Sequence, residues 1–316
     1  MSTTINTVTG TITPEQLGKT LMHEHVYVKY GGTFDDTPLP GRDEIVAVCS
    51  DYITRVKNAG IETVVDPTTT DLGRNAQLLA ELAQKTDFNI ICATGIYSAG
   101  TYLRVREDLG GPDAVTELFV RELTEGINGT DIKAGIIKVV TGAPLISAAE
   151  HELLLVAAKA AVATGAPIIT HTEGTLGDEQ QRILGEAGVA PHNILIGHSC
   201  LSTNINYHLQ IIRDGSYLGF DRFGMPGMSD EVRAESLRKL LDAGCATHLC
   251  PSHDSVWYWV DGPQIGTGHY KNWVPTNFFD RIIPMLTYGG VTDQQIETML
   301  RDNPRRFFAG EKPEKI

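Results

Sequence analysis

The chain has 316 residues, of which 41% are hydrophobic and 21% charged, as expected of a globular protein with a full core. Its formal charge of −13 argues against non-specific binding to nucleic acid or to anionic membrane surfaces. No window is apolar for long enough to span a bilayer. The first residues also lack the basic and apolar regions of a secretory signal, so we expect no membrane partner.

Short apolar runs alternate with longer stretches of helical periodicity along the chain. Read in order, they predict strands at 20–28, 63–66, 89–95, 134–140, 167–171, 194–198, 217–221 and 247–251. Between and after them we expect helices at 43–59, 74–85, 113–126, 147–164 (capped by Ser147), 178–187, 204–214, 230–243, 277–286 and 293–302.

Strands that alternate with helices pair in parallel, and eight such units favour an α/β fold of the (β/α)8 TIM-barrel type. A doubly wound sheet is the alternative, but no Gly-X-Gly-X-X-Gly follows the first strand. No linker-like stretch divides the chain, so we expect one domain over residues 1–316.

The cysteines are odd in number, scattered and without Cys-X-X-Cys spacing: Cys49, Cys92, Cys200, Cys245 and Cys250. This pattern is typical of free thiols in a reducing compartment rather than of a disulfide framework or a zinc knuckle. We therefore expect a cytoplasmic protein.

The first predicted strand contains Met22-His23-Glu24-His25-Val26. Residues i and i+2 of a strand share a side, so His23 and His25 project together and Glu24 points away. Two such imidazoles make half of a divalent-metal site if other ligands converge on them. Taken alone, such a pair is more often only a polar strand end.

Other candidate ligands lie at the carboxyl ends of strands, where active sites of TIM barrels lie. Lys138 is in the fourth strand, His171 and His198 end the fifth and sixth, and Asp254 follows the eighth. Each has an ordinary interpretation alone, as a rim histidine or a turn cap, but their joint placement indicates one shared site. The remaining histidines are expected to be structural or solvated: His151, His192, His208, His248, His253 and His269.

Lys138 is flanked by Ile136, Ile137, Val139 and Val140. Burying an unpaired ammonium is costly, and desolvation lowers the pKa of a lysine. A neutral amine can react with carbon dioxide to give a carbamate, a carboxylate-like ligand that can bridge two cations. The alternative is a lysine paired with a buried acid.

Taken in order, His23-Glu24-His25, Lys138, His171, His198 and Asp254 resemble the phosphotriesterase family of the amidohydrolase superfamily, closest to the phosphotriesterase-like lactonases. The resemblance runs from the segment 17–25 to the segment 302–308. It implies two divalent cations, with His23, His25 and Asp254 on the more buried one and His171 and His198 on the more exposed one. It also implies that carboxylated Lys138 (N6-carboxylysine) and a hydroxide bridge them, and that the protein is a homodimer.

Two cations lower the pKa of a shared water and polarise the substrate oxygen, so the expected reaction is hydrolysis by that hydroxide, with Asp254 as proton acceptor. Zinc is the expected metal, with cobalt, manganese or iron as alternatives. The resemblance places a tyrosine, Tyr97, near the metals, where it hydrogen-bonds a lactone oxygen or only packs at the rim. It gives Arg222 a role in setting the neighbouring loop beside the substrate.

The loop after Asp254 contains Trp257 and Trp259, which form either an aromatic lid that binds an apolar acyl chain or a subunit contact. We expect a lactonase that opens N-acyl-homoserine lactones, and is thus quorum-quenching, or other γ- and δ-lactones, with promiscuous activity on organophosphate triesters. The alternatives are a primary organophosphate triesterase, a carboxylic-ester hydrolase and, from another class, a non-catalytic metal-binding protein.

Overall fold

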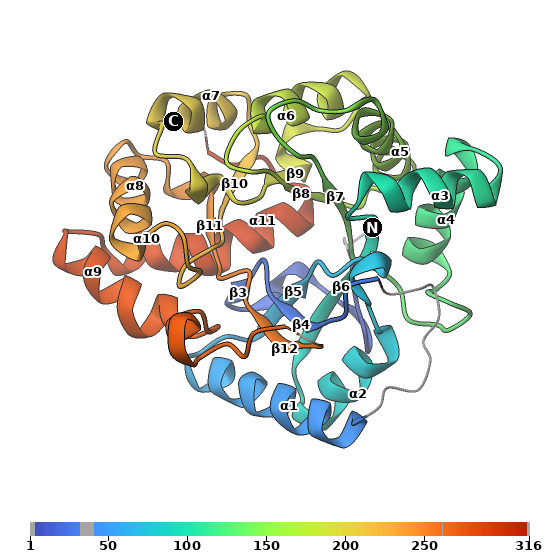
Figure 1. Ribbon diagram of the computed structural model, residues 1–316. Coiled ribbons are helices and arrows are strands. Elements are labelled where there is room, and N and C mark those ends of the chain that lie inside the picture. The colour runs from blue at the N-terminus through green and yellow to red at the C-terminus, as the bar shows by residue number, and fades with distance from the viewer. Residues whose placement is uncertain (1–3, 32–40, 261, 315–316) are drawn as a thin grey trace.

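A parallel sheet forms the centre of the molecule (Figure 1). The computed structural model describes residues 4–31, 41–260 and 262–314. In this part of the chain, eight strands pair in the order β11-β10-β9-β8-β7-β6-β5-β3, all in parallel. They are β3 (Thr20–Leu21), β5 (Thr63–Asp66), β6 (Asn89–Gly95), β7 (Ile136–Val140), β8 (Ile168–His171), β9 (Ile194–Ile196), β10 (Tyr217–Phe220) and β11 (Leu249–Pro251).

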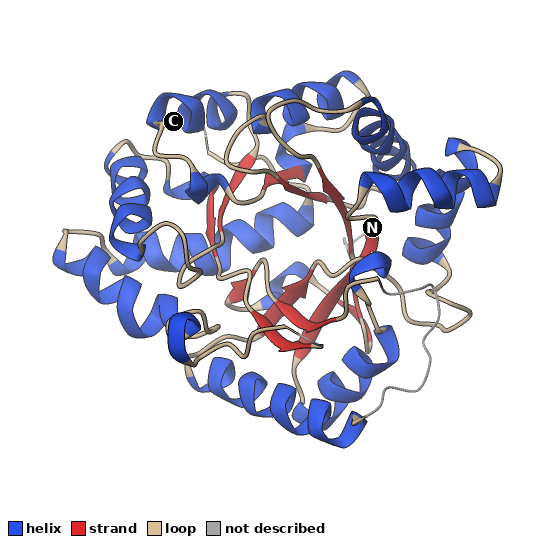
Figure 2. Cartoon of the chain, in the orientation of Figure 1, coloured by secondary structure: helices blue, strands red, loops and turns tan. Residues whose placement is uncertain are grey.

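Helices surround the strands, and their apolar faces pack against the outside of the sheet (Figure 2). They are α1 (Arg42–Asn58), α2 (Ala76–Thr86), α3 (Ala99–Leu109), α4 (Pro112–Thr124), α5 (Ala148–Thr164), α6 (Gly177–Glu186), α7 (Ile205–Arg213), α8 (Asp230–Asp242), α9 (Ile283–Tyr288), α10 (Asp293–Glu297) and α11 (Asn303–Ala309). As predicted, Ser147 caps α5, because its side chain accepts a hydrogen bond from the Glu150 backbone N–H. The TIM-barrel prediction is confirmed.

The barrel closes between its first and last strands, both of which are broken. β3 continues, after an interruption, into β4 (His25–Val28), and β11 continues into β12 (Val256–Trp259). β4 and β12 pair in parallel, with Val256 opposite His25. At the break, the Asp254 N–H donates to the His23 carbonyl at 3.0 Å and the His25 N–H to the Ser255 carbonyl at 2.9 Å. We call residues 20–28 and 249–259 the seam.

Several elements differ from the sequence prediction, including α11, which lies beyond the last predicted helix. The strand expected over 20–28 is interrupted, and the segment expected as a loop after Asp254 begins with β12. Helix α3 was not predicted, nor was the antiparallel hairpin of β1 (Ile5–Thr7) and β2 (Gly10–Ile12). β12 exists because it pairs with β4, more than 200 positions earlier in the sequence, and such a contact leaves no local periodicity.

Inward side chains of the strands fill the lower part of the barrel. Ile136 and Ile169 belong to this apolar cluster, together with Val65, Ile91, Leu195 and Cys250. Lys138 and His171 lie two residues further along β7 and β8, so they point to the same inward side one layer higher. The polar site therefore rests on a packed apolar floor.

The five cysteines are buried and unpaired, as their spacing predicted. Within the described ranges, no helix has both the length and the apolar character required to cross a membrane.

Candidate metal centre and active site

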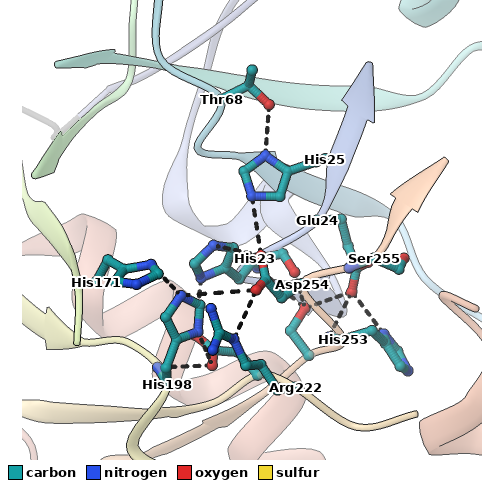
Figure 3. A network of polar contacts seen from close by, with 12 residues as sticks. His23, Glu24, His25, Thr68, His171, His198, Arg222, His253, Asp254 and Ser255 are labelled. Atoms are coloured by element: carbon teal, nitrogen blue, oxygen red, sulfur yellow. Dashed lines mark hydrogen bonds and ion pairs between the residues drawn. The ribbon is translucent and has the colours of Figure 1, made fainter. Parts of the chain in front are cut away.

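Six side chains that the sequence predicted as ligands meet at the carboxyl ends of the strands, and Figure 3 labels all of them except Lys138. None is more than 7% exposed: His23, His25, Lys138, His171, His198 and Asp254. Two of them, His198 and Asp254, have left-handed backbone conformations, with φ of 58° and 52°. Non-glycine residues rarely adopt this conformation, and such residues cluster at functional sites.

Asp254 is the centre of the seam half of this site. Its Oδ1 lies 3.1 Å from Nε2 of His25 and 3.3 Å from Nε2 of His23. Nε2 of His23 is also 3.3 Å from Nζ of Lys138. His23, His25 and Asp254 together form a group whose ligand atoms lie within 4.8 Å of one another, close enough to share one cation.

His171 and His198 form the other half. Nδ1 of His171 lies 2.9 Å from Nε2 of His198, and the two rings are nearly perpendicular, at 84°. His171 thus presents Nδ1 to the site, whereas the other three histidines present Nε2.

Each imidazole uses its remaining nitrogen to contact an orienting group. Asp221 is 2.9 Å from Nδ1 of both His23 and His198, one carboxylate oxygen to each ring. Thr68 Oγ1 is 2.7 Å from Nδ1 of His25, and Glu173 Oε1 is 3.0 Å from Nε2 of His171. Contacts of this kind fix the tautomer and orientation of metal-binding histidines.

The sequence reasoning did not single out these three orienting residues. Asp221 ends the seventh predicted strand, so the same strand-end criterion that selected His171 and His198 also applies to it. Thr68 and Glu173 lie beyond strand ends and have no residue pattern that distinguishes them. A second metal-like group, His23, His198 and Asp221, consists of these orienting contacts.

Burial favours the neutral form of three of the imidazoles. It lowers the pKa of His171 to about 4 and that of His198 well below its usual range, and it also lowers the pKa of His23. For Asp254 burial favours the neutral acid, but the neighbouring imidazoles and Arg222 outweigh it and hold the pKa well below the ordinary range. Burial lowers the pKa of Lys138 to about 8, so roughly a tenth of the amine is uncharged at pH 7.

These donors fit a pair of divalent cations. If the ring N–H of His198 donates to Asp221 and that of His171 donates to Glu173, the other nitrogens of the two rings carry lone pairs. These two nitrogens face each other at 2.9 Å. Facing lone pairs repel unless a cation lies between or beside them. Imidazole nitrogens and a carboxylate are ligands that zinc and other first-row divalent metals accept.

A cavity of about 110 Å³ opens over these donors. Tyr97, Arg222 and Trp259 line it, together with Tyr30, Met225 and Trp273. The ring of Tyr97 packs edge-on against His171 at 5.4 Å, and Nε of Arg222 donates to Oδ2 of Asp254 at 3.0 Å. Arg222 is therefore in contact with a candidate ligand, in addition to any role in setting its loop.

Trp257 is placed elsewhere. It is 3% exposed, packs on Tyr52 and donates from Nε1 to Oγ of Ser255 at 3.1 Å. It is not among the residues that line the cavity. Trp257 and Trp259 both belong to β12, which is held by β4, so the expectation that Trp257 contacts substrate from a loop is corrected: its ring is part of the core.

The fold and the site together define a class, the metal-dependent hydrolases built on a TIM barrel. The chain matches the model of the phosphotriesterase family over residues 3–308 and belongs to that family. It is therefore a hydrolase of a family that uses a binuclear metal centre.

Individual relatives support this assignment. The chain is 38% identical over 316 residues to the phosphotriesterase homology protein of Mycobacterium tuberculosis H37Rv, with 96% of this chain and 97% of the relative covered. It is 33% identical over 308 residues to an aryldialkylphosphatase of Saccharolobus solfataricus, with 94% and 97% covered.

Solved structures from Deinococcus radiodurans are also similar. Its organophosphorus hydrolase matches with a TM-score of 0.90 and 38% identity over 97% of both chains. A mutant of its PTE-like lactonase matches with a TM-score of 0.88 and 37% identity, over 96% of this chain and 99% of the other.

Proposed function

We propose that this hydrolase opens lactones, N-acyl-homoserine lactones or other γ- and δ-lactones, and also hydrolyses organophosphate triesters as a side activity. The observation that carries the proposal is the convergence of four buried imidazoles, Asp254 and Lys138 under a small cavity with Tyr97 and Trp259 at its wall. The similarity to a PTE-like lactonase is in keeping with it.

We propose that Lys138 is carboxylated. Its uncharged amine attacks the carbon of carbon dioxide, an N–C bond forms and one proton is released, which leaves an anionic carbamate on Nζ. The lowered pKa of Lys138, about 8, makes this amine available. The carbamate then joins the seam half of the site, where Nζ lies 3.3 Å from His23, to the half formed by His171 and His198.

His23, His25, Lys138, His171, His198 and Asp254 would hold two divalent cations, which would lower the pKa of a bound water and polarise the substrate oxygen. Asp254 takes the proton of the attacking water and delivers it to the leaving oxygen. Its hydrogen bond from Arg222, 3.0 Å long, holds the accepting carboxylate toward the cavity. The Tyr97 hydroxyl donates to the ring oxygen of the lactone.

The size of the cavity bears on the substrate. At about 110 Å³ it is smaller than typical small-molecule sites of about 300–1,000 Å³, so it accommodates the lactone ring rather than a whole acylated molecule. An acyl chain would extend along Trp259 and Tyr30, whose rings lie 5.6 Å apart. Tyr30 is 59% exposed and has free apolar surface for such a chain.

A steady-state substrate profile tests the proposal. We expect kcat/KM for a panel of lactones, followed with a pH indicator, to exceed that for paraoxon and for p-nitrophenyl esters. Esters or triesters that surpass every lactone by orders of magnitude would replace the proposal with the alternative, a primary triesterase or ester hydrolase. A non-catalytic binding protein would turn over none of them, but it would have no need of a buried proton acceptor such as Asp254.

Lys138→Ala tests the carbamate. We expect the metal content to fall from two ions per chain to one or none, and short carboxylic acids to restore the second ion by replacing the lost carboxylate. Elemental analysis measures this, with Lys159→Ala as the control because Lys159 is an exposed lysine paired with Asp113 on the surface. Unchanged metal content in Lys138→Ala refutes the bridging role.

The metal and the assembly complete the proposal. Zinc is the metal that we expect, with cobalt, manganese or iron as alternatives, and elemental analysis of the purified protein decides among them. We also propose a homodimer, which sedimentation at several protein concentrations tests.

A further inference from the structure

Glu24, the residue between His23 and His25, is fully buried and faces away from the cavity (Figure 3). Its carboxylate contacts the interrupted part of the last strand. Oε1 accepts from the His253 backbone N–H at 2.9 Å and lies 2.8 Å from Oγ of Ser252. Oε2 accepts from the Ser255 backbone N–H at 3.2 Å and also from the Ser255 hydroxyl.

The side chain of His253 completes this arrangement. Its Nε2 accepts a hydrogen bond from the Phe278 backbone N–H at 2.9 Å, which places the ring proton on Nδ1. Nδ1 lies 2.7 Å from Oε1 of Glu24 and donates to it. The buried charge of Glu24 is thus compensated by several donors, all of them from residues 252, 253 and 255.

The residue enclosed by these contacts is Asp254. Its φ of 52° is a conformation that costs free energy for a residue other than glycine, so neighbouring contacts must hold it. The main-chain bonds of Asp254 and His25 join the two broken strands on either side of the turn. Glu24 adds side-chain contacts across the same break, to the two neighbours of Asp254 and to Ser252.

We propose that Glu24 is a positioning residue that holds residues 252–255 in the turn from which the Asp254 carboxylate reaches His23 and His25. The segment 23–25 thereby provides two ligands, His23 and His25, and through Glu24 it positions the third, Asp254. The inference rests on the proposed role of Asp254 as a ligand and does not depend on which substrate is hydrolysed.

Glu24→Gln tests it, because glutamine keeps the shape but replaces one oxygen with an NH₂ group. In either orientation of the amide, that group faces a backbone N–H, of His253 or of Ser255. We expect the apoprotein to bind Co²⁺ about 10- to 100-fold more weakly at its tighter site, as is typical when an outer contact of a ligand is removed. On the substrate that the wild type hydrolyses best, kcat should fall while KM stays unchanged, since Tyr97 and Trp259 are unaltered.

Glu122→Gln is the matched control. Glu122 is also a buried carboxylate, bound by both terminal nitrogens of Arg74 at 2.7 Å, but it lies on α4, behind the sheet. This variant should lose stability and keep the cobalt affinity of the wild type. If Glu24→Gln likewise loses only stability and binds cobalt as tightly as the wild type, the positioning role is overturned and Glu24 is a structural residue.

Ser255→Ala provides a milder second variant, in case Glu24→Gln does not fold. It retains the charge of Glu24 and removes one donor next to Asp254. Weaker cobalt binding supports the proposal, and wild-type affinity contradicts it. Because the titration requires no substrate, a lack of lactone turnover would refute the proposed function and leave this result standing.

Discussion

The seam and the wall of strands β5 to β9 supply ligands to the same cavity in different ways. In the wall, Lys138 is paired in register with Ile169, and His171 with Val140, so continuous main-chain hydrogen bonds place both side chains. In the seam the regular ladder is interrupted at His23 and Asp254, where two main-chain bonds remain and side chains such as Glu24 and Ser252 supply further contacts.

Because of this difference, we expect substitutions near the wall to affect mainly stability and substitutions in the seam to affect mainly metal binding. A regular strand is held by many similar bonds, so a substitution beside it should lower the free energy of unfolding before it displaces a ligand. The broken strands are held by a few specific side-chain contacts, so a substitution there should displace ligands at a modest cost in stability.

The largest effect is expected at the seam, from Asp254→Asn. The variant loses the anionic ligand and the proton acceptor, and we expect kcat to fall by about 10²- to 10⁴-fold. Steady-state kinetics on the best substrate of the wild type, with metal content measured in parallel, checks this. Asp113→Asn is the control because Asp113 is exposed and remote from the site. A kcat close to that of the wild type in Asp254→Asn would remove Asp254 from the mechanism.

Behind the wall, Glu122→Gln should cost about 3–5 kcal/mol of unfolding free energy, because it removes the negative charge that is paired with the buried guanidinium of Arg74. The side chains of Arg74 and Glu122 are only 1% and 3% exposed. Urea denaturation measures the loss. Reduced turnover per folded, metal-loaded molecule would contradict the separation of wall and seam.

The contribution of the Arg74–Glu122 ion pair to the free energy of unfolding depends on pH. Burial opposes ionisation of Glu122, but the charge and hydrogen bonds of Arg74 outweigh it and lower the pKa below the ordinary value of 4.5. A carboxyl with a lowered pKa stabilises the fold at pH values above 4.5, and this contribution is lost as the pH falls through the lower value of the folded state. The difference in unfolding free energy between the wild type and Glu122→Gln should therefore shrink as the pH drops below 4.5. A difference that stays constant there would contradict this account.

Asp221 links wall and seam, since it directly follows β10 and orients both His198 and His23. The amide of Asp221→Asn has one oxygen, so it cannot accept hydrogen bonds equally well from both rings. We expect metal affinity to fall by about 10- to 100-fold. Competition of the loaded protein with a chelator measures the loss. If both ions are retained at wild-type affinity, the orienting role of Asp221 is wrong.

The smallest effect is expected from Glu173→Gln. Glu173 orients only His171, and its side chain is 51% exposed, so water can replace part of the lost contact. We expect a loss of metal affinity of about tenfold or less, at the low end for an orienting contact. A loss equal to that in Asp221→Asn would mean that burial of the orienting carboxylate does not matter.

The fold could be predicted from the sequence because its signals are local. The apolar runs that became β5 and β6 and the periodic helices α5 and α8 are visible in short windows, and their alternation implies parallel strands. The candidate ligands could also be found, because parallel strands bring their carboxyl ends together, and position in the chain then predicts position in space. Asp221 lies at the end of a predicted strand, so the same rule could also have identified it.

The remaining features depend on contacts between distant residues. The break in the first strand, the existence of β12 and the left-handed turn at Asp254 all follow from the pairing of residues 23–28 with residues 252–259. The roles of Glu24 and Glu173 and the core position of Trp257 likewise depend on which groups surround them in space. Side-chain orientation and burial are set by the closed barrel as a whole, and no short stretch of sequence contains that information.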